Sequence, residues 1–72
     1  MEYYNKLLCV TFEELTGGDD PVIKSDTLFK NVCRGNIQSA RQGKGEGNYA
    51  LYVYDSIPKK YREKFEARYG DP

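Results

Sequence analysis

The sequence predicts one small α+β domain, and three observations lead to this class. The chain has 72 residues, of which 39% are hydrophobic and 14% aromatic, so it can enclose a single modest core. Apolar residues recur at three- and four-residue spacing in two segments, as they do in amphipathic helices. Three glycines within residues 43–47 separate two strand-like segments. We therefore expect short helices against a small sheet, in one domain over residues 1–72.

The chain begins with a predicted strand followed by a short helix. Residues 3–10 are mostly aromatic and aliphatic, with one lysine among them, which favours a first strand. Thr11 then starts a helix, because its hydroxyl can accept a hydrogen bond near Glu14 while the Glu14 carboxylate reaches back to it. Gly17 and Gly18 end this helix after little more than one turn. A polar loop over residues 17–24 follows, which Val22 and Ile23 are expected to hold against the core.

A second helix is predicted from Ser25, which is a favourable N-cap residue. Gly35 suits the left-handed conformation that commonly ends a helix. Between them, one apolar stripe repeats at helical spacing and is expected to face the core. Its members are Leu28, Phe29, Val32 and Cys33.

A hairpin with a glycine-rich basic tip follows the second helix. Residues 37–41 and 49–54 form its predicted arms, and the tip between them carries Lys44. Because three glycines offer no side chains to a packed core, the pattern favours a two-stranded ribbon for this segment. A helix followed by a cationic, glycine-rich hairpin is the outline of a winged DNA-binding module.

The last predicted element is an amphipathic helix. It begins after Ser56, with Pro58 in its first turn, and Gly70 ends it. One residue in every four is apolar along it, which gives one face to the core. These residues are Ile57, Tyr61, Phe65 and Tyr69.

Charge is divided unevenly along a chain whose net charge is zero. Residues 1–23 contain five acids and one lysine, a net charge of −4, whereas residues 24–44 contain five bases and one acid, a net charge of +4. Screening over about 8–10 Å separates such regions, so one face of the domain can be cationic. The alternative is an ordinary mixed surface.

The residue types present exclude several classes of function. The chain has no histidine and shows no nucleophile–base pair or metal-ligand cluster, so we expect no catalysis, metal, cofactor or small-molecule substrate in this domain. Cys9 and Cys33 are predicted to be buried free thiols. No secretory leader or membrane span is recognisable, which suggests a reducing, cytoplasmic setting.

Five features, taken in order, resemble the N-terminal DNA-binding domain of phage Mu-type transposases and the related Mu repressors. An apolar strand leads into a Thr-capped acidic helix, a Gly/Pro loop precedes a helix that ends near a glycine, and a Gly-Lys-Gly tip precedes a Ser-aliphatic-Pro helix start. They occupy residues 10–15, 17–21, 33–35, 41–45 and 54–58.

The resemblance implies a winged helix-turn-helix, with one short strand, three helices and a two-stranded wing. It further implies binding of duplex DNA at phage or transposon sites, with the second helix in the major groove and the wing on the adjacent groove or backbone. On the same grounds we expect this domain to be the N-terminal part of a longer protein, such as a transposase, whose other partners are subunits of a transposition complex.

Candidate DNA contacts divide by position. On the outer side of the second helix, Arg side chains can recognise guanine and Asn side chains can recognise adenine. Hydroxyl groups at the start of this helix can contact a phosphate group. Cations at the hairpin suit phosphate or the minor groove. The alternatives are a solvated helix face, a helix cap and a soluble hairpin tip. The candidates are Ser25, Thr27, Lys30, Asn31, Arg34, Arg41 and Lys44, and the four cations should share one side of the molecule.

Other functions are also open at this point. The same fold could serve as a protein-interaction module with an apolar patch of Tyr3, Tyr4 and Tyr49, or as a small phage regulator similar to an excisionase. Tyrosines on the last hairpin arm could stack on single-stranded bases. The basic start of the last helix, Lys59, Lys60 and Arg62, is expected to be a solvated face.

Overall fold

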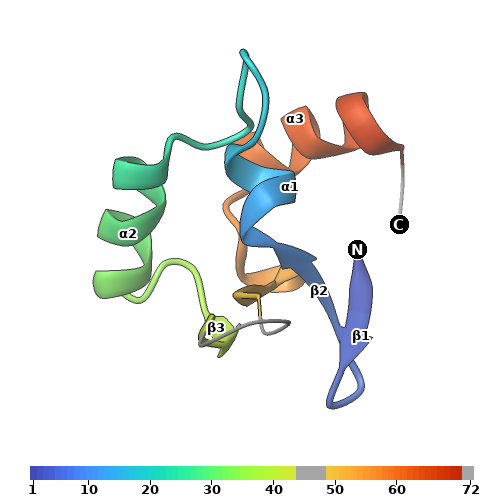
Figure 1. Ribbon diagram of the computed structural model, residues 1–72, viewed down its shortest axis with the longest axis vertical. Helices are drawn as coiled ribbons and strands as arrows, with labels where there is room; N and C mark the ends of the chain where they lie inside the picture. Colours follow the sequence, from blue (N-terminus) through green and yellow to red (C-terminus); the bar gives the residue numbers. More distant parts are fainter. Residues whose placement is uncertain (44–48, 71–72) are drawn as a thin grey trace.

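One antiparallel sheet, with strand order β1-β2-β4-β3, organises the described part of the chain. The computed structural model describes residues 1–43 and 49–70. The strands are β1 (Glu2–Tyr4), β2 (Leu7–Thr11), β3 (Ser39–Arg41) and β4 (Leu51–Val53). The helices are α1 (Phe12–Thr16), α2 (Ser25–Cys33), α3 (Lys59–Tyr69) and the short 3-10 turn η1 (Tyr54–Ser56). In the view of Figure 1, α1 lies between α2 and α3, with the sheet below them. The predicted α+β class is therefore confirmed.

The N-terminal segment is a hairpin, so the prediction of one strand over residues 3–10 is wrong. Asn5 and Lys6 have backbone φ angles of 51° and 67°, and they reverse the chain between β1 and β2. Two successive residues at positive φ match the twist of an antiparallel pair, and Tyr3 accordingly pairs with Leu8. The Asn-Lys turn gives little warning in the sequence, because lysine rarely adopts positive φ. The sheet thus has one strand more than predicted.

Helix α1 begins at the predicted capping box. The Thr11 hydroxyl accepts a hydrogen bond of 3.0 Å from the Glu14 N–H, and the Glu14 carboxylate accepts one of 2.9 Å from the Thr11 N–H. The helix ends at Gly17, whose N–H donates to the Glu13 carbonyl. A Cβ atom at Gly17 would lie 2.6 Å from that carbonyl oxygen, so a glycine fits this close approach.

The loop between α1 and α2 is held on the core, as predicted. Val22 and Ile23 are buried, and the Ile23 N–H donates to the Leu15 carbonyl at 3.0 Å. This backbone hydrogen bond joins the loop to α1 directly. It therefore determines where the chain enters α2.

Helix α2 begins one residue earlier than a Ser25 cap would place it. The Lys24 carbonyl already accepts a hydrogen bond from the Leu28 N–H at 2.9 Å, so Lys24 is the N-cap and Ser25 lies in the first turn. The Lys24 side chain makes no capping hydrogen bond, and the prediction that Ser25 is the N-cap is wrong. The other end is as predicted, since Gly35 has a φ of 80°, where glycine is favoured.

The predicted apolar stripe on α2 is divided between core and surface. Leu28 is buried and Val32 is half-buried, four residues further along the same side of the helix. Phe29 and Cys33 lie next to them around the helix axis and are exposed, with Phe29 at 57%. The prediction of a buried thiol is therefore confirmed for Cys9 and wrong for Cys33.

Strands β3 and β4 form the arms of the predicted second hairpin. Ser39 pairs with Tyr52 and Arg41 with Leu51 in antiparallel register. Residues 44–48 of the glycine-rich tip, including Lys44, lie outside the described residues. The two arms follow α2 in sequence.

Helix α3 closes the core, although the predicted four-residue repeat holds only in part. Ile57 and Phe65 are buried, whereas Tyr61 is half-buried and Tyr69 is exposed. The rings of Tyr54 and Phe65 meet edge to face, with centroids 5.8 Å apart. None of the helices in the described residues is long and apolar enough to cross a membrane.

Candidate nucleic-acid interface

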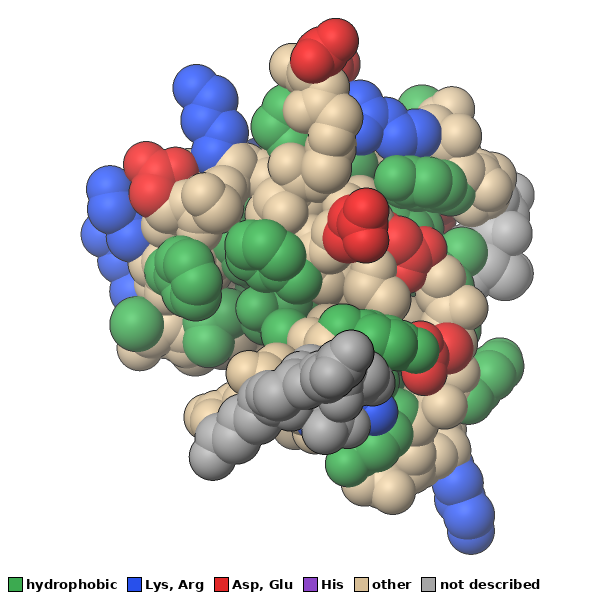
Figure 2. Space-filling model, viewed as in Figure 1, with side chains coloured by type: hydrophobic (Ala, Val, Ile, Leu, Met, Phe, Trp, Pro, Cys, Tyr) green, Lys and Arg blue, Asp and Glu red, His purple; other side chains and the backbone are tan. Residues whose placement is uncertain are grey.

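Three exposed cations lie at α2. Lys24, Lys30 and Arg34 are exposed, and no described carboxylate lies within ion-pair distance of any of them. Lys30 and Arg34 are four residues apart and so share one side of the helix. Figure 2 shows Lys and Arg side chains along the edge of the molecule where α2 lies, while hydrophobic side chains cover the side of α2 that faces the viewer.

Packing beneath α2 keeps this outer side open. The buried Leu28 anchors the helix in the core, and the Phe12 and Phe29 rings, with centroids 6.3 Å apart, connect α1 to α2. Of the two predicted phosphate contacts, Ser25 is exposed and Thr27 is half-buried. The exposed start of α2 thus includes Ser25 together with Lys24.

Asn31 differs from its neighbours on α2, because its amide is engaged within the chain. Its Nδ2 donates to the Thr27 carbonyl at 2.8 Å, and its Oδ1 accepts from Asn36 Nδ2 at 3.2 Å. Its carbonyl also accepts from the backbone N–H groups of Asn36 and Ile37. These contacts join the last turn of α2 to the segment before β3. They engage the amide group of Asn31, which the sequence analysis predicts to contact adenine.

Arg41 is packed against tyrosines rather than against α2. Its Nε donates to the Tyr49 carbonyl at 3.0 Å, and its guanidinium carbon lies 4.7 Å from the Tyr49 ring centroid and 5.4 Å from that of Tyr4. The Tyr49 hydroxyl in turn donates to Glu2, a hydrogen bond that raises the pKa of Tyr49. The expected convergence of four cations therefore does not include Arg41, and Lys44 lies outside the described residues.

Most cations on α3 have partners within the chain. Lys64 forms an ion pair of 3.0 Å with Asp20, and Arg68 approaches the same carboxylate at 3.8 Å. The Lys59 Nζ lies 3.9 Å from the Glu63 Oε1, and the Lys60 Nζ lies over the Tyr61 ring, 4.9 Å from its centroid. At Asp20, the hydrogen bond from Lys64 lowers the pKa of the carboxyl group. These contacts leave α2, rather than α3, as the element with the most available positive charge.

The tyrosines do not form one stacking platform. Tyr52 and Tyr54 are buried at 5% and 4% exposure, whereas Tyr49 is 47% exposed. Because a platform for single-stranded bases needs several open ring faces, these three rings offer at most one.

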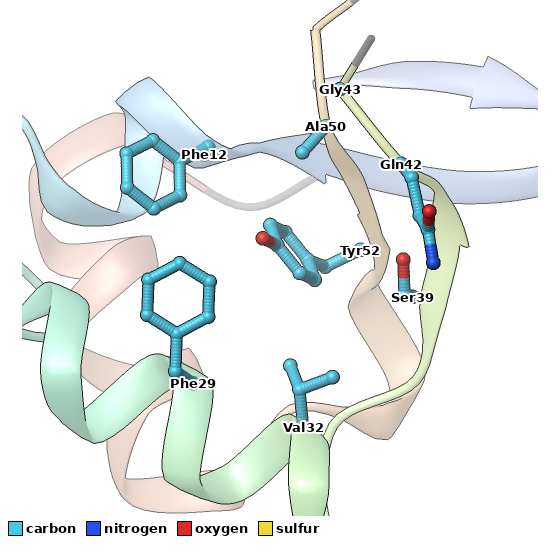
Figure 3. Close-up of a pocket in the computed structure, with 8 residues that line it drawn as sticks. All are labelled: Phe12, Phe29, Val32, Ser39, Gln42, Gly43, Ala50 and Tyr52. Atoms are coloured by element: carbon cyan, nitrogen blue, oxygen red, sulfur yellow. The ribbon is translucent and has the colours of Figure 1, made fainter.

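A cavity of about 350 Å³ lies between α1, α2 and the β3–β4 pair (Figure 3). Sequence patterns did not indicate it, because its lining combines residues from four separate elements. The helical repeat of Phe29 and Val32 predicts an apolar face of α2, and these two residues line the cavity. The lining residues are Phe12, Phe29, Val32, Ser39, Gln42, Gly43, Ala50 and Tyr52.

The described residues contain no group of three or more His, Cys, Asp or Glu side chains that could hold a metal ion. Comparison of the chain with protein-family models, with curated proteins and with solved structures found no match.

Proposed function

We propose that this chain is a winged helix-turn-helix domain that binds duplex DNA and catalyses no reaction itself. The order α1, loop, α2, β3, β4 supports this assignment, because it supplies two successive helices and then a wing. The observation that carries the proposal is a set of exposed cations at α2 that form no ion pair with any described residue, namely Lys24, Lys30 and Arg34.

Each of these cations has a distinct use on DNA. The major groove is wide enough for a helix, and an Arg side chain such as that of Arg34 can donate two hydrogen bonds to guanine. Lys30, on the same side of α2, would contact the same groove or its bordering phosphates. Lys24, at the helix start, is placed for a phosphate contact that orients the domain.

The zero net charge of the chain is compatible with DNA binding. Asp20 is paired with two cations of α3, and Glu14 is paired with the N-terminal amine and the Thr11 N–H. These acids are partly neutralised by their own partners, whereas the cations at α2 keep their charge available. Binding would then depend on local charge, which solvent ions screen over about 8–10 Å.

The resemblance to Mu-type transposases and repressors supports a role at phage or transposon sites. In that setting the domain would position a longer protein, together with other subunits of a transposition complex, on DNA. A small phage regulator similar to an excisionase would use the same DNA chemistry in a different context.

A duplex-binding titration with matched charge variants tests the proposal. Fluorescence anisotropy of a labelled duplex should show binding that weakens steeply between 50 and 200 mM salt, roughly as expected for four to six released counterions. Lys30→Gln combined with Arg34→Gln should lower affinity by about tenfold or more. The control, Lys6→Gln with Lys60→Gln, removes the same charge from exposed positions outside α2 and should change affinity less than about threefold.

Two outcomes would contradict the proposal. One is the absence of salt-dependent binding to any duplex by the unmodified domain. The other is equal loss of affinity in the two double variants, which would mean that α2 has no special role.

Protein interaction is a second candidate function, and one observation favours it. Tyr3 on the edge strand β1 is 75% exposed, and the exposed Tyr49 lies near β1 through its hydrogen bond to Glu2. Amide chemical shifts distinguish the two functions. A protein interface at this patch predicts perturbations in β1 on addition of a partner and none in α2 on addition of duplex DNA.

A further inference from the structure

A large apolar side chain is exposed on α2, directly beside the cations of that helix. Phe29 is 57% exposed, whereas Phe12 is half-buried and Phe65 is fully buried. Lys30 follows Phe29 in sequence, and the exposed Cys33 lies one turn further along the same flank of the helix. Single exposed apolar residues are common on protein surfaces. The neighbours of Phe29 therefore have to indicate what it contacts.

Phe29 lies between the core side and the charged side of α2. Successive residues of an α-helix point about 100° apart, and Phe29 stands between the buried Leu28 and the exposed Lys30. The Phe29 ring extends toward Phe12 of α1 (Figure 3), with ring centroids 6.3 Å apart. Contact with α1 thus supports the ring, while more than half of the residue's surface stays open.

The charge around Phe29 favours a polyanionic partner. Residues 24–34 contain three cations and one acid, a net charge of +2, and the cations form no ion pair with a described residue. The acid is Asp26 in the first turn of α2, whose carboxylate accepts a hydrogen bond of 2.9 Å from the Thr27 N–H. An apolar ring with net positive charge around it fits a partner that combines negative charge with a small apolar group.

The major groove of duplex DNA offers that combination. Phosphates border the groove, and the apolar group that the bases present in it is the C5 methyl group of thymine. The groove is about 12 Å wide, and an α-helix with its side chains is about 10–12 Å across. A helix within the groove therefore brings its flanks, as well as its outermost side, close to base edges. Phe29 lies on such a flank.

We propose that Phe29 contacts the C5 methyl group of thymine and makes the domain select sites with thymine beneath α2. This inference rests on the proposed binding of duplex DNA and names one base that the domain reads. Lys30 and Arg34 supply attraction to phosphate and hydrogen bonds to base edges, whereas Phe29 supplies apolar contact. Burial of one methyl group corresponds to about fourfold in affinity.

Two duplexes that differ only in this methyl group test the proposal. One is an alternating duplex of dA and dT, and the other carries deoxyuridine in place of every thymidine. Both present the same phosphates and the same hydrogen-bonding groups on the bases. Fluorescence anisotropy at constant salt should show that the unmodified domain binds the thymine duplex about fourfold or more tightly than the uracil duplex.

Variants assign the preference to the aromatic ring. Phe29→Ala and Phe29→Gln should each bind the two duplexes with equal affinity. Alanine and glutamine are good helix formers, so α2 should be retained, and circular dichroism checks this. Tyr3→Ala is the control, because it removes an aromatic ring that is 75% exposed on β1 and should keep the full preference. Lys30→Gln should weaken binding to both duplexes alike and leave their affinity ratio unchanged.

The outcomes separate this inference from the proposed function. Binding that Lys30→Gln weakens, but that is equal for the two duplexes in the unmodified domain, would leave the DNA function standing and overturn the role of Phe29. A preference that persists in both Phe29 variants, or that Tyr3→Ala also abolishes, would overturn it as well. Absence of binding to either duplex would contradict the proposed function itself, and this inference with it.

Discussion

Arg41, the last residue of β3, and Tyr49, which precedes β4, are joined by two contacts. The Arg41 Nε donates to the Tyr49 carbonyl at 3.0 Å, and the guanidinium carbon lies 4.7 Å from the centroid of the Tyr49 ring. Tyr4 of β1 flanks the same guanidinium at 5.4 Å. The Arg41 side chain, a predicted DNA contact, therefore connects the hairpin arms to the opposite edge strand of the sheet.

Arg41→Met should lower the free energy of unfolding by about 1–2 kcal/mol, because it removes one hydrogen bond and two cation–aromatic contacts. Urea denaturation measures this change. Lys30→Met is the matched control, since the Lys30 side chain is exposed and has no ion pair among the described residues, and it should stay within about 0.5 kcal/mol of the parent. Equal midpoints for the two variants would show that the Arg41 contacts do not stabilise the fold.

The two buried tyrosines of the β4 region should respond differently to loss of the hydroxyl. Tyr54→Phe breaks the hydrogen bond to Glu66 and should cost about 1–2 kcal/mol of unfolding free energy. Tyr52→Phe should cost nothing measurable or stabilise the domain, because its hydroxyl has no partner among the described residues. Thermal or urea unfolding compares them, and a larger loss for Tyr52→Phe would contradict this assignment.

Thr11→Ala should destabilise the domain by about 1 kcal/mol, since it removes the side-chain acceptor at the start of α1. Thr11→Ser retains that acceptor and should recover most of the loss. Chemical denaturation is again the measurement. Thr27→Ala provides a control within α2, where no hydrogen bond of the Thr27 hydroxyl to another described residue is lost and the alanine is a better helix former.

Acid should weaken the fold through Glu14. Although burial alone raises the pKa of Glu14, hydrogen bonds from the N-terminal amine and from the Thr11 N–H outweigh it and hold the pKa below its ordinary value of 4.5. A carboxyl group whose folded pKa is lowered stabilises the fold above its unfolded pKa, and this stabilisation is lost as the pH falls through the folded pKa. Unfolding free energy should therefore decrease below about pH 4.5.

Glu14→Gln provides the check, because glutamine does not titrate. The variant should be less stable than the parent at pH 7 and should lose less stability between pH 7 and pH 3. Some acid dependence should persist, since the pKa of Asp20 is also lowered by its hydrogen bond from Lys64. An identical decline in parent and variant would exclude Glu14 as a contributor.

Asn31 and Lys30 should separate stability from DNA binding. Asn31→Ala removes the amide contacts to Thr27 and Asn36, and it should lower unfolding free energy by about 1 kcal/mol. Lys30→Gln should leave stability unchanged and weaken duplex binding. Anisotropy at a temperature where both variants are folded tests this, and a change of base preference in Asn31→Ala would show that its amide contacts DNA directly.

Local interactions made several features predictable from the sequence. The capping box of Thr11 and Glu14 involves residues three apart, and the left-handed end of α2 depends on Gly35 alone. The second hairpin follows from two strand-like segments around a glycine-rich turn. Such features depend on a few consecutive residues, and their energetics are the same in many folds.

Tertiary structure alone decided which of those residues are available for function. Glu2 and Tyr49 are 47 positions apart, and only the folded sheet brings them together beside Arg41. The same packing exposes Phe29 and directs the Tyr52 hydroxyl into a cavity. Sequence periodicity assigns a residue to a face of its own element, but it does not specify what another element places against that face, because that depends on contacts between distant segments.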